Sequence, residues 1–482
     1  MDLQGVQQWS FDFFAQKPVV VEPSRAELTS DAGLLPIRQF DERIGLTEQF
    51  AAVLEDPRDA EATKHSYLEM VRMRVYGILA DYPDQNDHDT LGADPVFKLI
   101  AGRSPDAQNL ASQPTLSRFE NAISPRSLLR LEELEVAQFV AAFSQPPLRL
   151  TLDMDTYDDP TYGDQQLTFW HDYYKQYQYQ VRTITCAEND LVASSCLLYG
   201  SAHVALGAAD DLRRVVGALR ERFPDVQIRF RADNAFGVPR VLDACEELGI
   251  DYDLGIKMNP VLKTQSDSLL EDLRAGQQQT GQPQRGAVIF AYRAGSWSHS
   301  RQCIVRVEVT EDDSNRRAIV TSRRGAAHYP LVSYDEYADR GESENRNKEL
   351  KRGLWGDRLS DHRYMANNFR LHMHVAAHNL LVRLRHQVAD PPADDPSVEV
   401  PREALPAAER RRYFNQRRLR DPLGEGHPCT WRTRLIKVAA EVIVSARRIL
   451  VRLSANWPYL GHYAQVAKAV LTQAGPAPLE SG

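Results

Sequence analysis

The sequence predicts a mixed α/β fold with flanking helices, and three observations lead to that prediction. Residues 148–156 alternate apolar and polar side chains, which is the two-residue period of a half-buried strand. Two further strand patterns follow at 177–186 and 194–200. After them, strands alternate with helices as far as residue 257. Consecutive strands followed by strand–helix alternation indicate a mixed sheet that is covered by helices.

Residues 1–145 form the first expected region, and their pattern is mostly helical. Ser30 could cap a first helix, and residues 63–79 and 115–123 continue with apolar residues at helical spacing. A polar stretch at 82–94 indicates a turn between helices. Short helices of this kind could form a DNA-binding region or could simply support the domain that follows.

Residues 146–258 contain the first part of the sheet, and two of its strands end in aspartates. Asp153 and Asp155 lie on the same side of the first strand, because side chains alternate with a period of two. The strand pattern at 226–233 ends in Asp233. A single aspartate at a strand end is more often a cap or turn residue, so these residues gain interest only in combination with others.

Residues 259–324 are expected to be a β-rich insertion into the sheet domain. A linker-like stretch at 275–286 is followed by strand patterns with no helix between them. These patterns cover residues 287–294, 303–311 and 317–322. Trp297 lies in this insertion and could stack on a base beside the site, although a tryptophan in a β-rich segment is as often a core residue.

The sheet domain is expected to resume at residues 325–389, with a helix from Tyr334 to Lys351. At 100° per residue, Arg340, Glu344 and Lys351 fall at about 300°, 340° and 320° from Tyr337. These four polar side chains therefore share one narrow arc. A solvated face with i,i+4 ion pairs is the ordinary interpretation. A carboxylate between an arginine and a lysine would also suit metal ions and phosphates.

Residues 390–482 are expected to be a linker rich in proline and aspartate, followed by a basic segment. The whole chain has a net charge of −8, but residues 402–452 hold 13 Lys and Arg against 5 Asp and Glu. This asymmetry indicates a polyanionic partner such as DNA. Arg417 and Arg418 lie within the basic segment and are candidate phosphate contacts.

The composition argues against several classes of protein. There is no run of 18 or more apolar residues, so we expect no membrane span. The start of the chain lacks the features of a secretory signal, so we expect a cytoplasmic protein. Five cysteines without paired spacing argue against disulfides and zinc, and no GxxxxGKS/T loop indicates a nucleotide cofactor. His374 and His378 are four residues apart but lack the HExxH pattern, so core or surface roles are expected.

Three carboxylates from separate elements suit a two-metal site for phosphoryl transfer. They are Asp155 or Asp153, Asp233 and Glu344. Oxygen ligands suit Mg²⁺ and Mn²⁺, and two ions about 3.5–4 Å apart can activate an attacking oxygen and stabilise a leaving one. Basic residues beside Glu344 favour a polyanionic substrate over the sugar substrate of a glycosidase.

The spacing Tyr337-x2-Arg340-x3-Glu344-x6-Lys351 resembles the YREK signature of DDE-type bacterial insertion-sequence transposases. Other stretches are similar to one group of these proteins, insertion sequence family thirteen-eighty. They are LDMDTYDDPTYGDQQLTFW, RADNAF, CEELGIDYDLGIK, YADRGESENRNKELKRGLWGDRLSDH and ANNFRLHMHVAAHNLLVRLR. The resemblance covers roughly residues 25–455 and is densest within 150–385.

The resemblance implies an RNase H-like catalytic domain that the β-rich insertion interrupts. It implies that Asp155, Asp233 and Glu344 are the catalytic metal ligands, and that they hold two Mg²⁺ ions for which Mn²⁺ can substitute. Asp155 is preferred to Asp153 because Thr156 follows it, as a Thr or Ser typically follows the first aspartate of the family.

The implied function is a DNA transposase that hydrolyses phosphodiester bonds at the ends of an insertion sequence and then transfers the strands. Its partners would be double-stranded DNA of the element ends and the target, and further copies of the chain in a dimer or larger synaptic assembly. It would be associated with the bacterial nucleoid. The implied DNA contacts are Tyr337, Arg340, Lys351, Trp297, Arg417 and Arg418. Two alternatives stay open: a nuclease of the same fold that does not join strands, and a domesticated DNA-binding protein that has lost catalysis.

Overall fold

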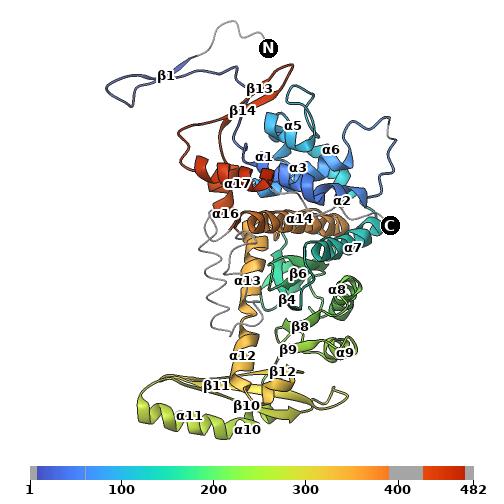
Figure 1. The fold of residues 1–482 in the computed structure, drawn as a ribbon, viewed down its shortest axis with the longest axis vertical. Coiled ribbons are helices and arrows are strands. Elements are labelled where there is room, and N and C mark those ends of the chain that lie inside the picture. Colours follow the sequence, from blue (N-terminus) through green and yellow to red (C-terminus); the bar gives the residue numbers. More distant parts are fainter. Residues whose placement is uncertain (1–7, 60, 390–426, 473–482) are drawn as a thin grey trace.

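A computed structural model describes residues 8–59, 61–389 and 427–472 of the chain. The molecule is elongated, with a helical region at one end and a large sheet that reaches the other end (Figure 1). Helix α14 (Tyr364–Ala389) lies between the two regions. No helix within the described ranges is long and apolar enough to cross a membrane.

The helical region is built mainly from the first part of the chain. Its helices are α1 (Leu34–Ile44), α2 (Leu46–Ala52), α3 (Tyr67–Leu79), α4 (His88–Leu91), α5 (Pro95–Ala101), α6 (Gln113–Asn121) and α7 (Pro125–Ala141). Their apolar side chains form one core with α14, including Tyr76, Phe97 and Phe369. Ser30 does not cap α1, because its hydroxyl donates to the Asp31 carboxylate instead. Gly33 is the cap residue, and no side chain caps the helix.

The described C-terminal elements pack onto this helical region. They are α16 (Pro428–Trp431), a π-helical turn (Arg432–Ile436), β13 (Ala440–Val444), β14 (Ile449–Leu453) and α17 (Leu460–Thr472). Strand β13 pairs with β14 and with β3 (Leu28–Thr29). Arg432 donates to the carbonyls of Ile78 and Leu79, and Lys437 pairs with Asp31 at 2.7 Å. These two cations of the basic segment therefore serve packing.

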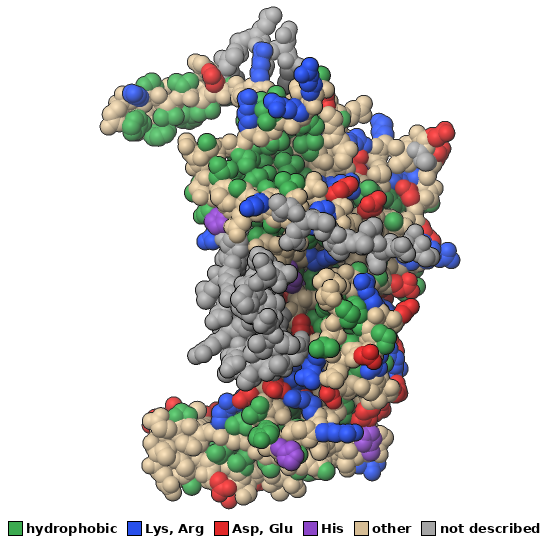
Figure 2. All heavy atoms as spheres, viewed as in Figure 1, with side chains coloured by type: hydrophobic (Ala, Val, Ile, Leu, Met, Phe, Trp, Pro, Cys, Tyr) green, Lys and Arg blue, Asp and Glu red, His purple; other side chains and the backbone are tan. Residues whose placement is uncertain are grey.

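A hairpin of β1 (Trp9–Phe11) and β2 (Val19–Val21) projects from the helical end. Figure 2 shows hydrophobic side chains along this hairpin and on the surface next to it. Phe13, at the turn, is 79% exposed. On one chain the hairpin therefore leaves apolar rings in contact with water.

A nine-stranded mixed sheet forms the second region. Its strands are β4 (Arg149–Pro160), β5 (Phe169–His171), β6 (Gln176–Cys186), β7 (Val192–Leu198), β8 (Gln227–Ala232), β9 (Asp251–Ile256), β10 (Gln284–Tyr292), β11 (Arg301–Val309) and β12 (Ser314–Thr321). The order is β10-β11-β12-β9-β8-β4-β6-β5, and β7 also pairs with β6. Strand β8 is parallel to β4 and β9, and the other pairs are antiparallel. The mixed α/β prediction is confirmed.

Strands β10 to β12 extend this sheet, because β12 pairs with β9. Two helices precede them, α10 (Pro260–Gln265) and α11 (Asp267–Thr280). The prediction of a linker from residue 275 was wrong for residues 275–280, which lie in α11. The cap residue Gly281, in the left-handed conformation (φ 65°), follows the helix. One side of α11 buries Leu270 against the sheet, which supports a helix that its glutamine-rich sequence did not suggest.

Helices cover both faces of the sheet. On one face lie α8 (Ala208–Arg222), α9 (Pro239–Glu247) and α11, which share a core with apolar residues of β4 and β8. On the other face lie α12 (Pro330–Ala338) and α13 (Gly341–Lys348). Helices α12 and α13 follow each other along the length of the sheet toward α14 (Figure 1).

The expected single helix from Tyr334 to Lys351 is divided into three parts. Helix α12 ends at Ala338, two turn residues follow, and α13 begins at Gly341. A π-helical turn (Glu349–Gly353) then follows α13. The prediction of one regular helix was therefore wrong, although Arg340 itself keeps right-handed helical angles (φ −52°, ψ −27°). Such π-helical turns are frequent at functional sites.

Candidate active site

Asp155 and Asp233 come from two neighbouring parallel strands. The last residue pair between β4 and β8 is Met154–Ala232, so the two aspartates follow at the same level of the sheet. Strand β8 ends at this level, whereas β4 continues to Pro160. Asp155 therefore lies inside its strand. The sequence pattern had predicted that it lies at the strand's end. The end of β8 is what opens space beside it.

Asp153 is fully engaged in a buried ion pair. Nε and Nη2 of Arg231 donate to its two carboxylate oxygens at 2.6 Å and 2.7 Å. Asp153 is 2% exposed, and Nη1 of Arg231 also donates to the carbonyl of Glu336 on α12 at 2.7 Å. A bidentate pair of this kind fills the side of the carboxylate that a metal ion or substrate would need. Of the two aspartates, Asp155 is the one that remains available.

Arg340 joins Asp155 to Glu344. Its Nη1 lies 3.3 Å from an oxygen of Asp155, and its Nη2 lies 3.7 Å from an oxygen of Glu344. Burial raises the pKa of Asp155 to about 6, and the charges of Asp233 and Glu344 add to this shift, against the effect of Arg340. Burial therefore outweighs the arginine, and the pKa of Asp155 stays above its usual value.

Tyr337 lies against the same place from the α12 side. A Cβ added to Gly255 on β9 would lie 2.9 Å from the Tyr337 hydroxyl and 3.0 Å from the Asp233 carbonyl carbon. Only glycine at position 255 leaves room for both groups. Burial raises the pKa of Tyr337 to about 12, so its hydroxyl stays protonated at neutral pH. It is placed to donate a hydrogen bond near Asp233.

Lys351 reaches the same strand from the π-helical turn. Its ammonium pairs with Asp158 of β4 at 2.5 Å, and Gln176 of β6 donates to the other oxygen of Asp158 at 3.0 Å. Asp158 is thus the partner of the lysine. A phosphate at Lys351 would have to compete with this carboxylate.

Acidic groups outnumber bases along this part of β4. Asp159 is fully buried, and burial together with nearby Asp357 raises its pKa well above the usual range. An excess of desolvated carboxylates is typical of sites that bind cations. Oxygen donors such as Asp155, Asp233 and Glu344 suit Mg²⁺ and Mn²⁺. In the described ranges, however, no group of three His, Cys, Asp or Glu side chains is gathered closely enough to hold a metal ion.

Some predicted site residues are not brought to this place. Trp297 is buried, with its ring 5.4 Å from that of Tyr292 and the Arg301 guanidinium 5.3 Å from its centre. Little of its surface is left for a base. Arg417 and Arg418 lie outside the described residues. His374 and His378 are buried, and burial lowers their pKa values to about 3 and about 4, which agrees with core roles.

The sequence interpretation missed an aromatic residue of this site. Burial raises the pKa of Tyr174, and the charges of Asp158, Asp155 and Asp233 contribute to the same shift. Tyr174 lies in the turn between β5 and β6. The signal was present as the density of rings in residues 168–179, of which the family resemblance covered only residues up to Trp170.

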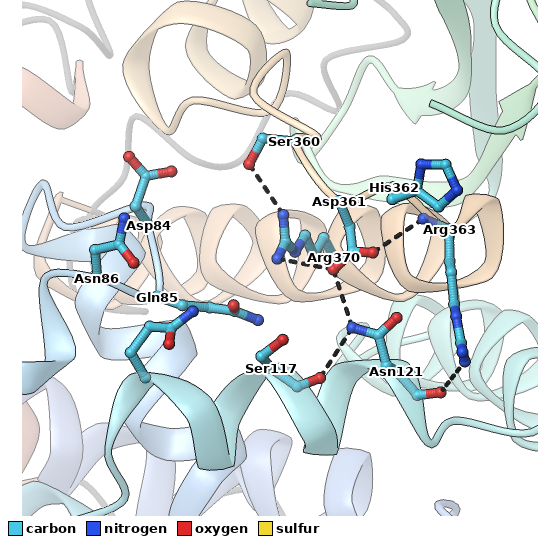
Figure 3. A pocket seen from close by; sticks show the side chains of 11 residues that line it. Asp84, Gln85, Asn86, Ser117, Asn121, Ser360, Asp361, His362, Arg363 and Arg370 are labelled. Carbon is cyan, nitrogen blue, oxygen red and sulfur yellow. Dashed lines mark hydrogen bonds and ion pairs between the residues drawn. The ribbon is translucent and has the colours of Figure 1, made fainter. Parts of the chain in front are cut away.

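The structure also holds a polar pocket of about 430 Å³ away from these carboxylates. It lies between residues 84–86, α6 and the start of α14, and Figure 3 shows its lining. Inside it, Arg370 binds Ser360 and Asp361, and Asn121 donates to Asp361 (Figure 3). Several of its polar groups therefore bind one another, and none of the predicted site residues lines it.

The chain belongs to the family Transposase DDE domain group 1, whose model matches residues 11–397. This membership supports a transposase, a class of DNA-recombining enzymes. The solved structures include a similar one, piggyBac transposase in a synaptic complex with hairpin DNA. The likeness has a TM-score of 0.39 and 12% sequence identity, and it covers 86% of this chain and 88% of that chain. No curated protein matches the chain.

Proposed function

We propose that this chain is a DNA transposase of insertion sequence family thirteen-eighty, with an RNase H-like catalytic domain and the YREK signature. It would bind the ends of its element, hydrolyse a phosphodiester bond there, and join the freed end to target DNA. Asp155, Asp233 and Glu344 would hold two Mg²⁺ ions, for which Mn²⁺ could substitute. When bound, such ions would polarise the phosphate and lower the pKa of an attacking water.

One observation carries this proposal. Asp155 and Asp233 stand side by side at the end of the β4–β8 pairing, and Arg340 joins Asp155 to Glu344. A buried carboxyl whose pKa is raised, Asp155, next to Arg340 and with Lys351 on the same strand, forms a site that favours cations and a phosphate together. The family membership supports the same chemistry.

The chain's own residues would orient the DNA strand. The Arg340 guanidinium can donate two hydrogen bonds to a phosphate once a cation replaces it at the carboxylates. Lys351 would place a charge nearby, and the Tyr337 hydroxyl would hydrogen-bond the strand. In the first step water attacks phosphorus, and the 3′-oxygen leaves as a 3′-hydroxyl. In the second step that hydroxyl attacks a target phosphodiester, forming one new phosphodiester and releasing one target 3′-hydroxyl.

The test is cutting of a plasmid that carries the DNA flanking the gene, in Mg²⁺ or Mn²⁺. We expect cuts at defined ends with the wild-type chain and their loss in Glu344→Gln. Glu342→Gln, on the same helix α13, makes the same change of charge and should leave cutting intact. Joined products would distinguish a transposase from a nuclease. DNA binding with no cutting under either metal would favour a non-catalytic DNA-binding protein.

The basic segment has a separate test. If Arg417 and Arg418 contact phosphates, replacing both with alanine should lower the slope of log K against log salt by about 2, since each phosphate contact contributes close to one. Filter binding across a salt series measures this slope. An unchanged slope in the double variant would remove these two arginines from the DNA contacts.

A further inference from the structure

An exposed surface of aromatic rings lies on the hairpin between β5 and β6. We call it the aromatic hairpin surface, and it consists of Trp170, Tyr173, Tyr174 and Tyr177. Tyr173 is 82% exposed, and the other three rings are between 47% and 54% exposed. Rings of this size are usually buried or at interfaces, because each removes a large apolar area from water. Four of them on one short hairpin therefore indicate a binding surface.

The rings contact one another by their edges. The Trp170 and Tyr177 centroids are 5.5 Å apart at an interplanar angle of 70°, and the Tyr173 and Tyr174 centroids are 5.0 Å apart at 90°. The indole N–H of Trp170 is held by Asp172 at 3.1 Å. Edge-to-face pairs of this kind favour one arrangement of the rings, and the rings keep about half or more of their surface exposed. The surface can thus accept flat partners without first being rearranged.

The hairpin is tied to the candidate active site. Gln176, the first residue of β6, donates to Asp158, and Asp158 in turn pairs with Lys351. Tyr174 stands close enough to Asp155 and Asp233 for their charges to act on its hydroxyl. A DNA strand with a phosphate at these carboxylates would therefore have its neighbouring bases beside this hairpin.

We propose that the aromatic hairpin surface stacks on unpaired bases of the DNA strand next to the phosphate that is cut. This inference rests on the proposed function, which it deepens by assigning a binding surface for single-stranded DNA. The occupant is a base rather than a phosphate, because the four rings are uncharged and offer exposed flat surfaces on which a base can stack. Every base has a π face, so such stacking tolerates any sequence.

The chemistry of the surface also favours bases over a protein partner. All four side chains are aromatic and three carry hydroxyl groups, while Leu167, just before β5, is an exposed aliphatic residue. A second copy of the chain would bury apolar area with any large side chain, whereas stacking requires a ring. This difference gives a direct test.

The experiment measures binding of a fluorescein-labelled dT15 strand and of a 15-base-pair duplex by anisotropy, in EDTA so that cutting does not contribute. In one double variant Trp170 and Tyr173 become leucine, and in the other both become phenylalanine. We expect the leucine variant to bind the single strand roughly 10-fold more weakly or worse, with a smaller change on the duplex. The phenylalanine variant should stay close to wild type. Phe13→Leu removes a ring of similar exposure from the loop between β1 and β2 on the helical region and should change neither affinity.

Three results would overturn the inference. They are wild-type binding by the leucine variant, equal losses in both double variants, and a change in the sedimentation of the leucine variant that shows a lost protein interface. Measuring plasmid cutting as well distinguishes a failure of the stacking proposal from a failure of the proposed function. Cutting by a leucine variant at the wild-type rate, with unchanged single-strand binding, defeats the stacking surface alone. Ring-dependent binding by a chain that never cuts would defeat the catalytic proposal alone.

Discussion

Two groups of charges in this molecule, one fully buried and one partly exposed, are balanced in opposite ways. In the helical region, Glu120 is 1% exposed and lies between two arginines, Arg74 at 2.7 Å and Arg370. Burial alone would raise the pKa of Glu120, but the two arginines outweigh it and hold the pKa below its usual value. At the sheet, burial raises the pKa of Asp155 to about 6, because Arg340 alone does not offset it and the charges of Asp233 and Glu344 add to the rise.

The difference separates stability from function. A carboxylate between two arginines is neutralised within the fold and has no need of an outside partner. Carboxylates that outnumber their arginine repel one another, and the fold keeps them close together despite this repulsion. A bound cation would reduce the repulsion. The two kinds of balance occur within one strand. Asp153, two residues before Asp155, is paired with Arg231 through both of its oxygens.

The sharpest test of this comparison exchanges the two aspartates of β4 for asparagine in turn. Asp155→Asn should lower cutting by roughly 10³-fold or more, as expected for loss of a catalytic group, while the protein stays folded. Asp153→Asn should destabilise the fold by about 3–5 kcal/mol, because it leaves Arg231 buried without its carboxylate. Plasmid cutting and urea unfolding, measured on both variants, check these outcomes. An Asp155→Asn protein that is stable and still cuts DNA would contradict the catalytic role assigned to Asp155.

The helical group gives the next largest effect. Glu120→Gln should destabilise the protein by about 3–5 kcal/mol, since it strands the buried cations of Arg74 and Arg370. Urea unfolding measures the loss. Glu133→Gln, an exposed change of the same kind on α7, should stay within about 0.5 kcal/mol of wild type. Equal small effects from both variants would show that the arginines find other partners.

The smallest expected effect is a pH dependence of stability. Because the folded pKa of Asp155 is raised from its ordinary value of 3.8 to about 6, the folded state binds the proton more tightly. The wild type should therefore lose stability relative to Asp155→Asn as pH rises from about 4 through the folded pKa to about 7, by roughly 2 kcal/mol, with little change above that. Unfolding of both proteins in urea at pH 4, 6 and 7.5 measures the difference. A difference in stability that does not vary with pH would mean that folding does not raise the pKa of Asp155.

Much of the site could be predicted because its signals are local. Alternation located the strands of Asp155 and Asp233, and spacing put Arg340, Glu344 and Lys351 on one side of a helical stretch. The structure places the basic side chains of that stretch against β4, where Arg340 meets Asp155 and Lys351 meets Asp158. The two turn residues between Ala338 and Gly341 interrupt the helix, yet both basic side chains still reach β4. Local periodicity carries such information because it depends only on residues a few positions apart.

What the sequence by itself determined was which residues face one another along each strand and helix, together with the kind of chemistry they offer. Tertiary structure decided which of two equivalent aspartates is free, because Arg231 that neutralises Asp153 comes from another strand 78 positions away. It also decided that Trp297 is buried while the rings of Trp170 and Tyr173 stay exposed. Burial and pairing depend on the elements that pack against a residue, and those elements are far away in the chain.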